Sequence, residues 1–176
     1  MDVSLESLES KALSYLERFD SSAAKLKEVL RRYALRRLGG QVSGVLPART
    51  ASKIDEIILR YSSSGIVSDA RYAESIARTL RERGMAQRGI IARLQARGVD
   101  RQQAESALAS VDADAMADAE LEAARKLVRR RRLGIHRPLH QRAAWRQRDL
   151  GVLARAGFSS SVAESALCPH GDREDP

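Results

Sequence analysis

Apolar residues recur along most of this chain at the spacing of a helix, and polar residues mark where the helices would begin and end. In one such stretch, Ala104, Ala107, Leu108 and Val111 fall at i, i+3, i+4 and i+7 and would form one buried stripe. Prolines are rare, with four in the chain and none in residues 48–137, so long helices are permitted there. The pattern predicts an all-helical protein.

An internal repeat is visible within this pattern. Residues 94–108 (LQARGVDRQQAESAL) and 153–167 (LARAGFSSSVAESAL) are identical at nearly half of their positions. Both read as a helix, a glycine, an apolar residue, a polar cap and a second helix. Gly98 and Gly157 fall where a helix would end in a left-handed residue, which glycine adopts without steric cost. A structural repeat explains this match better than coincidence.

A further helix precedes each of these pairs, so the repeating unit has three helices. One of the preceding helices is capped by Asp69 and closed by Gly84. The other begins near Asp114. Their apolar stripes are Tyr72, Ala73, Ile76, Ala77 and Leu80 in the first, and Ala117, Leu121, Ala124 and Val128 in the second.

A degenerate first copy of the unit lies upstream. Its first helix is predicted over Lys11–Phe19, and Ser21 or Ser22 would cap its second helix. Aligned with the later copies, the first copy carries an insertion, for which residues 34–48 are the candidate loop.

We therefore expect an all-α fold of three tandem three-helix repeats that form an elongated, curved array. Units this small bury little surface alone, but neighbouring units cover each other's faces. The repeats are predicted at residues 10–68, with the inserted loop at 34–48, at 69–112 and at 113–168. Residues 169–176 are expected to be a disordered tail.

The charge balance favours a polyanionic partner. The chain has 31 lysines and arginines against 23 acids, a net charge of +8, and arginine far outnumbers lysine. Guanidinium groups bind phosphate and carboxylate through paired hydrogen bonds, although a protein can also be basic without such a partner. A single cysteine excludes an intramolecular disulfide, and we find no signal peptide or membrane-spanning run, so we expect a cytoplasmic monomer without a membrane partner.

Catalytic chemistry is hard to place in this sequence. The three histidines and Cys168 lack the spacing of a structural metal site, and the glycines in 39–44 lack the lysine and hydroxyl of a phosphate-binding loop. No nucleophile has an evident base. We expect no enzyme activity, no cofactor and no metal.

The basic residues are a stronger lead. Residues 125–148 contain ten lysines and arginines and no acid, residues 71–101 contain eight arginines against three acids, and residues 25–37 form a third patch. A run of charge is usually a solvated face, and the Glu74–Arg78 spacing is an ordinary helix pair. For the surface as a whole we favour contact with a polyanion. The residues predicted to make it are Arg78, Arg81, Arg83, Arg88, Lys126, Arg129, Arg130, Arg131, Arg132, Arg142, Arg146 and Arg148.

Readout of individual bases is not expected. The last predicted helix, SSSVAESAL, has no basic residue that could read a base edge, and aromatic residues are few. Trp145 could be a stacking platform, but we favour a role as an anchor of the third core. Residues 112–122, with five acids and no base, could serve a second protein partner or could simply cap and solvate a helix start.

One segment resembles a known family. The stretch GIVSDARYAE at residues 65–74, followed by Arg78, Arg81, Arg83 and Gly84, is similar to the central signature of the RecX regulatory proteins. The opening ALSYLER, the Ser22 start before Leu26 and Leu30, and the closing LARAGFS fit the same family in order. The resemblance covers residues 10–168.

The resemblance implies a modulator of the RecA recombinase, acting in homologous recombination, DNA repair and the SOS response. Such proteins bind the RecA filament on single-stranded DNA and inhibit its ATPase and strand exchange, by blocking filament growth or promoting disassembly. Double-stranded DNA is a further candidate ligand. Two alternatives stay open: a general DNA-binding helical protein that contacts the phosphate backbone without a dedicated protein partner, and an adaptor whose basic face is only solvated.

Overall fold

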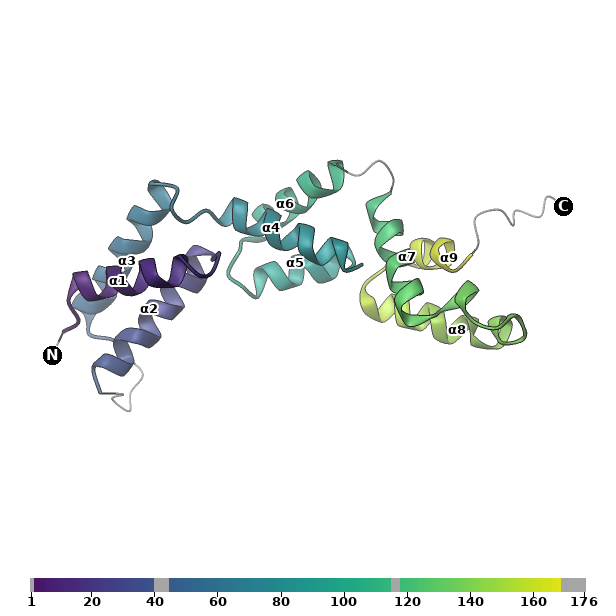
Figure 1. The fold of residues 1–176 in the computed structure, drawn as a ribbon, viewed down its shortest axis with the longest axis horizontal. Helices are drawn as coiled ribbons and strands as arrows, with labels where there is room; N and C mark the ends of the chain where they lie inside the picture. Colours follow the sequence, from purple (N-terminus) through teal and green to yellow (C-terminus); the bar gives the residue numbers. More distant parts are fainter. Residues whose placement is uncertain (1, 40–44, 115–117, 169–176) are drawn as a thin grey trace.

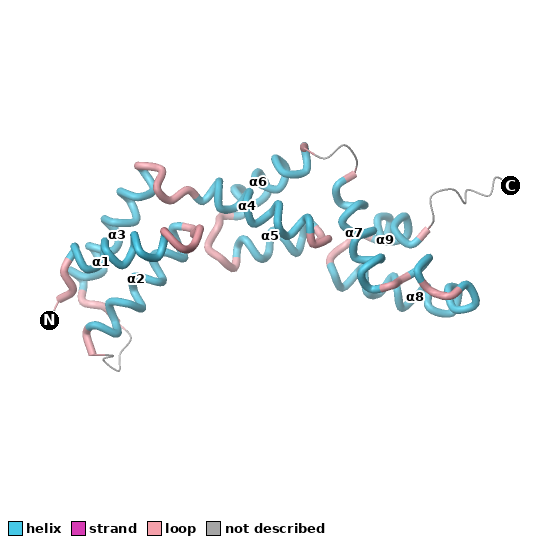
Figure 2. The backbone as a smooth tube through the Cα atoms, viewed as in Figure 1, coloured by secondary structure: helices cyan, strands magenta, loops and turns pink. Residues whose placement is uncertain are grey.

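The computed structural model describes residues 2–39, 45–114 and 118–168, and all regular structure in these ranges is helical. The helices gather in three groups that follow one another along a shallow arch (Figures 1 and 2). The all-α array of three-helix repeats is thus confirmed for the described residues. Unit 1 contains α1 (Leu5–Leu16), α2 (Ala23–Arg37) and α3 (Ala48–Ser63); unit 2 contains α4 (Asp69–Glu82), α5 (Gln87–Gln95) and α6 (Arg101–Ala113); unit 3 contains α7 (Ala119–Arg131), the short 3-10 helix η1 (Gly134–His136), α8 (Leu139–Ala156) and α9 (Ser160–Leu167).

Each unit has its own apolar core, built from aliphatic side chains. The largest fully buried apolar side chains are Leu8, Leu26, Leu30, Ile54 and Ile57 in unit 1, Ile90 and Leu94 in unit 2, and Leu153 and Val128 in unit 3. In unit 2 the fully buried alanines Ala73, Ala77 and Ala104 lie between α4 and α6. Small side chains let helix axes approach closely, which explains how a chain with few aromatic residues forms compact units.

The predicted glycine turns are confirmed. Gly98 and Gly157 have φ angles of +79° and +101° and end the second helix of units 2 and 3. The following residues, Val99 and Phe158, are buried, and their N–H groups donate to carbonyls in the helix just ended. Gly84 closes α4 in the same way, with a φ angle of +75°. Local sequence signals therefore set these chain reversals.

The first helix differs from the prediction. It spans Leu5–Leu16 instead of Lys11–Phe19, because Ser4 caps it by accepting a hydrogen bond from the N–H of Ser7. Phe19 lies beyond the helix and is half exposed.

Three other boundaries shift by less. Helix α2 continues to Arg37, so the first part of the predicted loop at 34–48 is helical, while 40–44 lie outside the described residues. Ser68, not Asp69, is the N-cap of α4, and α7 is capped by Asp118 instead of starting near Asp114. The predicted tail at 169–176 also lies outside the described residues. Within the described ranges, no helix is long and apolar enough to span a bilayer.

Candidate nucleic-acid interface

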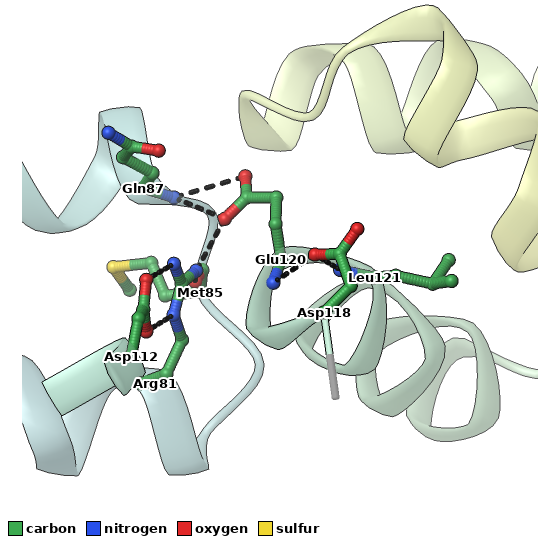
Figure 3. A network of polar contacts seen from close by, with 7 residues as sticks. All are labelled: Arg81, Met85, Gln87, Asp112, Asp118, Glu120 and Leu121. Carbon is green, nitrogen blue, oxygen red and sulfur yellow. Dashed lines mark hydrogen bonds and ion pairs between the residues drawn. The ribbon is translucent and has the colours of Figure 1, made fainter. Parts of the chain in front are cut away.

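Arg81 was predicted to contact a polyanion, and the structure corrects this. Its side chain is buried, with 7% of the residue exposed, at the junction of units 2 and 3 (Figure 3). Its Nε and Nη2 donate to the two carboxylate oxygens of Asp112 at 2.8 and 2.5 Å, and Nη1 donates to Glu120 at 2.5 Å. Burial opposes the charged form, but these hydrogen bonds outweigh it and raise the pKa of Arg81 above its usual value. The guanidinium group of Arg81 is therefore charged, and its N–H groups are hydrogen-bonded within the chain.

The five acids in residues 112–122 are all engaged within the chain. Asp112 and Glu120 hold Arg81, and Asp114 pairs with Arg78 at 3.2 Å. Asp118 caps α7, and Glu122 lies 2.7 Å from Arg125. This favours the capping role over a surface for a second partner. Arg78 is exposed but pairs with Asp114, whereas the spacing had predicted Glu74.

A basic cleft of about 660 Å³ lies between units 2 and 3. The end of α4 and the start of α5 form one wall, and α7 and the end of α8 form the other. Its charged lining residues are Arg83, Arg93, Arg130, Arg131 and Arg155, and none of the described residues that line it is acidic. Its apolar lining residues include Leu80, Met85, Leu127, Val152 and Ala156. Guanidinium groups converging without counter-charges suit phosphoryl oxygens.

The cleft gathers three of the predicted contact residues and adds two that lie outside that list. Arg83, Arg130 and Arg131 had been predicted, whereas Arg93 and Arg155 had not been selected. All five are exposed. Arg130 also donates from Nη1 to the carbonyl of Arg83 at 2.9 Å, which ties the two walls together. Arg93 could have been selected from its position around α5, because it lies on the side of this helix that faces unit 3.

The other predicted residues are spread around this cleft. Arg88 is exposed at the start of α5, and Lys126 is partly buried near Gly84. Arg129 faces a separate hollow that also contains Cys168. Arg132 ends α7 in a left-handed conformation with a φ angle of +53°. The four residues of the run Arg129–Arg132 thus do not share one face of the molecule.

The far part of unit 3 is organised by a buried acid. Asp149, 1% exposed, accepts from Nε and Nη2 of Arg137 at 2.8 and 2.7 Å and from the N–H of Gly134 at 2.9 Å. Burial alone would raise the pKa of Asp149, but these hydrogen bonds outweigh it and the pKa is lowered. Arg142 donates to the carbonyls of Ile135 and Arg137. Arg137 and Arg142 therefore fix the connection between α7 and α8.

Trp145 does not anchor the core, which corrects the favoured interpretation. It is partly buried, and the guanidinium carbons of Arg137 and Arg148 lie 4.5 and 4.7 Å from its ring centroid. Both contacts are cation–π pairs, which occupy the ring and orient Arg148. Arg146 is exposed beside a second hollow of unit 3.

A corresponding cleft of about 400 Å³ lies between units 1 and 2, and its charge is different. The end of α1, the start of α2, α4 and the end of α5 surround it. It contains Lys25 and Arg97 but also Asp20 and Glu28, and Lys25 pairs with Glu28 at 2.7 Å. Packing of two neighbouring units therefore does not require that the charged residues of the cleft between them all be arginines.

Metal binding finds no support in the described residues, which contain no group of three or more histidine, cysteine, aspartate or glutamate side chains that could hold an ion. The cleft between units 2 and 3 instead presents five exposed guanidinium groups, which are donors suited to anions.

Comparison with known proteins identifies the relatives. The family model described as "RecX, second three-helix domain" matches residues 68–108. A regulatory protein RecX of Myxococcus xanthus is 33% identical over 169 residues, covering 91% of this chain and 83% of the relative. One of Thermobifida fusca is 36% identical over 113 residues, covering 62% of this chain and 57% of the relative.

Solved structures agree on the fold. The crystal structure of RecX from Lactobacillus salivarius superposes with a TM-score of 0.66 at 20% identity, covering 93% of this chain and 94% of that one. A second crystal structure, of a regulatory protein RecX, gives a TM-score of 0.62 at 22% identity, covering 91% and 71%.

Proposed function

Since this chain belongs to the RecX family, we propose that it regulates the RecA recombinase by binding the RecA filament on single-stranded DNA. Binding would inhibit the ATPase and strand exchange of RecA, by blocking filament growth or promoting disassembly. The observation that carries the proposal is the arginine-only cleft between units 2 and 3, which suits the phosphates of a nucleic acid.

The shape of the molecule supports a filament as the target. The three units follow one another along an arch (Figure 1), and a long object can be contacted by several units at once. Exposed arginines extend from the cleft over α7 and α8 of unit 3. Linked contacts of this kind raise the overall affinity without requiring a tight contact at any one site.

The test is a DNA-dependent ATPase assay with RecA in excess over this protein. We expect ATP turnover to fall at a substoichiometric dose, and filaments in electron micrographs to become shorter. The double variant Arg131→Glu/Arg155→Glu should need a dose at least about tenfold higher, because two phosphate contacts are reversed in charge. Unchanged ATP turnover and filament length with the native protein would sink the proposal.

General binding to DNA is the second candidate, because the cleft could hold phosphates without any protein partner. It is separated from the first by a pull-down of RecA with and without single-stranded DNA and nucleotide. A filament regulator retains RecA and prefers the assembled filament. A general DNA-binding protein binds bare DNA as tightly as the filament, and its affinity falls steeply with salt.

A further inference from the structure

Arg81 is the buried centre of the contact between units 2 and 3, and its partners lie on both sides. Asp112 ends α6 and the carbonyl of Met85, 3.0 Å from Nη1, lies in the turn after α4, so these acceptors belong to unit 2. Glu120, in the first turn of α7, belongs to unit 3. Figure 3 shows the guanidinium between them. The network thus joins unit 2 to the first turn of α7, the helix whose later residues line the basic cleft.

Glu120 makes a second contact across the same junction. Its carboxylate accepts from the N–H of Gln87 at 3.1 and 3.2 Å. Gln87 begins α5, and the N-cap of that helix, Ala86, has no side chain that could cap it. An acid of unit 3 therefore caps a helix of unit 2, where a negative charge is favoured.

The junction of units 1 and 2 uses part of this arrangement. Asp69, in the first turn of α4, accepts from the N–H of Ala23 at 2.8 Å, so an acid of the downstream unit again meets the start of the second helix upstream. Here α2 already has its own cap, Ser22. Glu17 lies as far after Ser4, the N-cap of α1, as Arg81 lies after Ser68, the N-cap of α4. Glu17 is therefore the counterpart of Arg81 in unit 1, and it is exposed. The buried arginine is thus an addition at the junction with the arginine-only cleft.

We propose that Arg81 is a positioning residue for the cleft. Through Glu120 it fixes unit 3 against unit 2, so that Arg83 and Arg93 on one wall face the arginines of the other. Five positive charges that line one cleft repel one another, which disfavours the arrangement of the two walls. A buried, fully hydrogen-bonded ion network opposes this because it is satisfied in only one arrangement of the two units. The proposal rests on the proposed function only in that the cleft binds phosphate.

Simple electrostatics and this proposal predict opposite signs for the loss of Glu120. Removing an acid near a basic cleft makes its surroundings more positive, which by charge alone strengthens phosphate binding. If Glu120 positions the walls through Arg81, the same change weakens binding. Glu122 offers a matched control, because it lies on the same helix and pairs with Arg125 at 2.7 Å within unit 3.

The experiment compares the full-length variants Glu120→Gln and Glu122→Gln. Fluorescence anisotropy with a thymidine oligonucleotide reports affinity, and circular dichroism confirms folding. We expect Glu120→Gln to weaken binding about tenfold, and Glu122→Gln to bind within about twofold of the native protein or more tightly. Arg81→Lys keeps the charge but cannot bridge both acids, and it should behave like Glu120→Gln.

A second readout measures the junction without DNA. Spin labels at Ser75→Cys in α4 and Ser165→Cys in α9, both exposed positions, are introduced with Cys168→Ser. We expect a narrow distance distribution that broadens in Glu120→Gln and not in Glu122→Gln. Because no ligand is present, this result is independent of whether the protein regulates RecA.

Three outcomes would overturn the proposal. In the first, Glu120→Gln binds the oligonucleotide as tightly as Glu122→Gln. In the second, the distance distribution of Glu120→Gln is unchanged. In the third, the native protein does not bind the oligonucleotide, which removes the role of the cleft itself, while inhibition of the RecA ATPase would still uphold the regulatory function through another surface.

Discussion

The two junction clefts are formed by corresponding elements, yet one has mixed charge and the other is lined by arginines without acids among the described residues. In each, the upstream unit contributes the end of its first helix and the start of its second. The downstream unit contributes its first helix and the end of its second. The arrangement of the helices therefore does not determine the charge of the residues that line these clefts. The fold does not need this concentration of like charge, which is why we propose a binding role for the second junction.

The largest expected effect is on the packing of the first junction. A Cβ atom at Gly98, which has a φ angle of +79°, would lie 2.2 Å from the Cβ of Ala24. We expect Gly98→Ala to lower the free energy of unfolding by about 2–4 kcal/mol in urea denaturation, from backbone strain and overpacking together.

The control for this prediction is Gly65→Ala. Gly65 also has a positive φ, of +72°, but a Cβ there meets nothing within 4 Å, so only the backbone strain of about 1–2 kcal/mol should remain. Adding Ala24→Gly to Gly98→Ala should recover part of the loss. Equal effects at Gly98 and Gly65 would show that contact with Ala24 is unimportant.

Charge reversal in the second cleft should have the next largest effect. Arg131→Glu/Arg155→Glu is expected to weaken binding of a single-stranded oligonucleotide by about 30-fold and to flatten its dependence on salt, because fewer counterions are released. The control Arg31→Glu/Arg36→Glu makes the same change in net charge at exposed positions of α2. This control should lower the affinity for the oligonucleotide by less than about threefold. Equal losses would mean that only net charge matters.

Making the first cleft resemble the second should give a smaller gain. Asp20→Asn/Glu28→Gln removes both acids from the first cleft and leaves Lys25 and Arg97. We expect about three- to fivefold tighter binding of the oligonucleotide, since the positive charges of Lys25 and Arg97 are no longer offset by acids in this hollow. Unchanged affinity would show that the aromatic and apolar lining of this cleft, not its acids, excludes nucleic acid.

The smallest effect is a dependence on pH. A hydrogen bond from Lys25, supported by the positive charges of Lys25 and Arg32, lowers the pKa of Glu28 below 4.5. Glu28 is thus charged at neutral pH and becomes neutral only as the pH falls through this lowered value. In Arg131→Gln/Arg155→Gln, which introduces no further titrating group, the protonation of Glu28 should raise the affinity for a thymidine oligonucleotide about twofold over that range. With Glu28→Gln added, this part of the rise should disappear.

Features set by short stretches of sequence could be predicted. The turns at Gly98 and Gly157 could be predicted because a left-handed residue at a helix end is a local requirement that glycine meets. The apolar stripe from Ala104 to Val111 is buried, as its spacing predicted. The start of α1 was missed because Ser4 and Leu8 precede the more regular part of the pattern.

The candidate site was only partly accessible from sequence, because it depends on contacts between units. Nothing in the sequence distinguishes Arg81 from the other arginines, because only the folded chain brings Asp112 at the end of α6 and Glu120 at the start of α7 to it. Arg155 was overlooked because the acid-free run stops before Asp149, although that acid is buried and paired with Arg137. Charge counted along a chain does not distinguish a buried acid from an exposed one.

The contact between Ala24 and Gly98 also limits how this protein can diverge. Gly98 cannot accept a larger residue while Ala24 keeps its place, because a Cβ at Gly98 would lie 2.2 Å from the Cβ of Ala24. Substitutions there are tolerated in an evolving lineage only if the neighbouring turn shifts at the same time. Ala24 and Gly98, which are far apart in the sequence, should therefore change together during evolution. The exposed arginines nearby can be gained or lost one at a time.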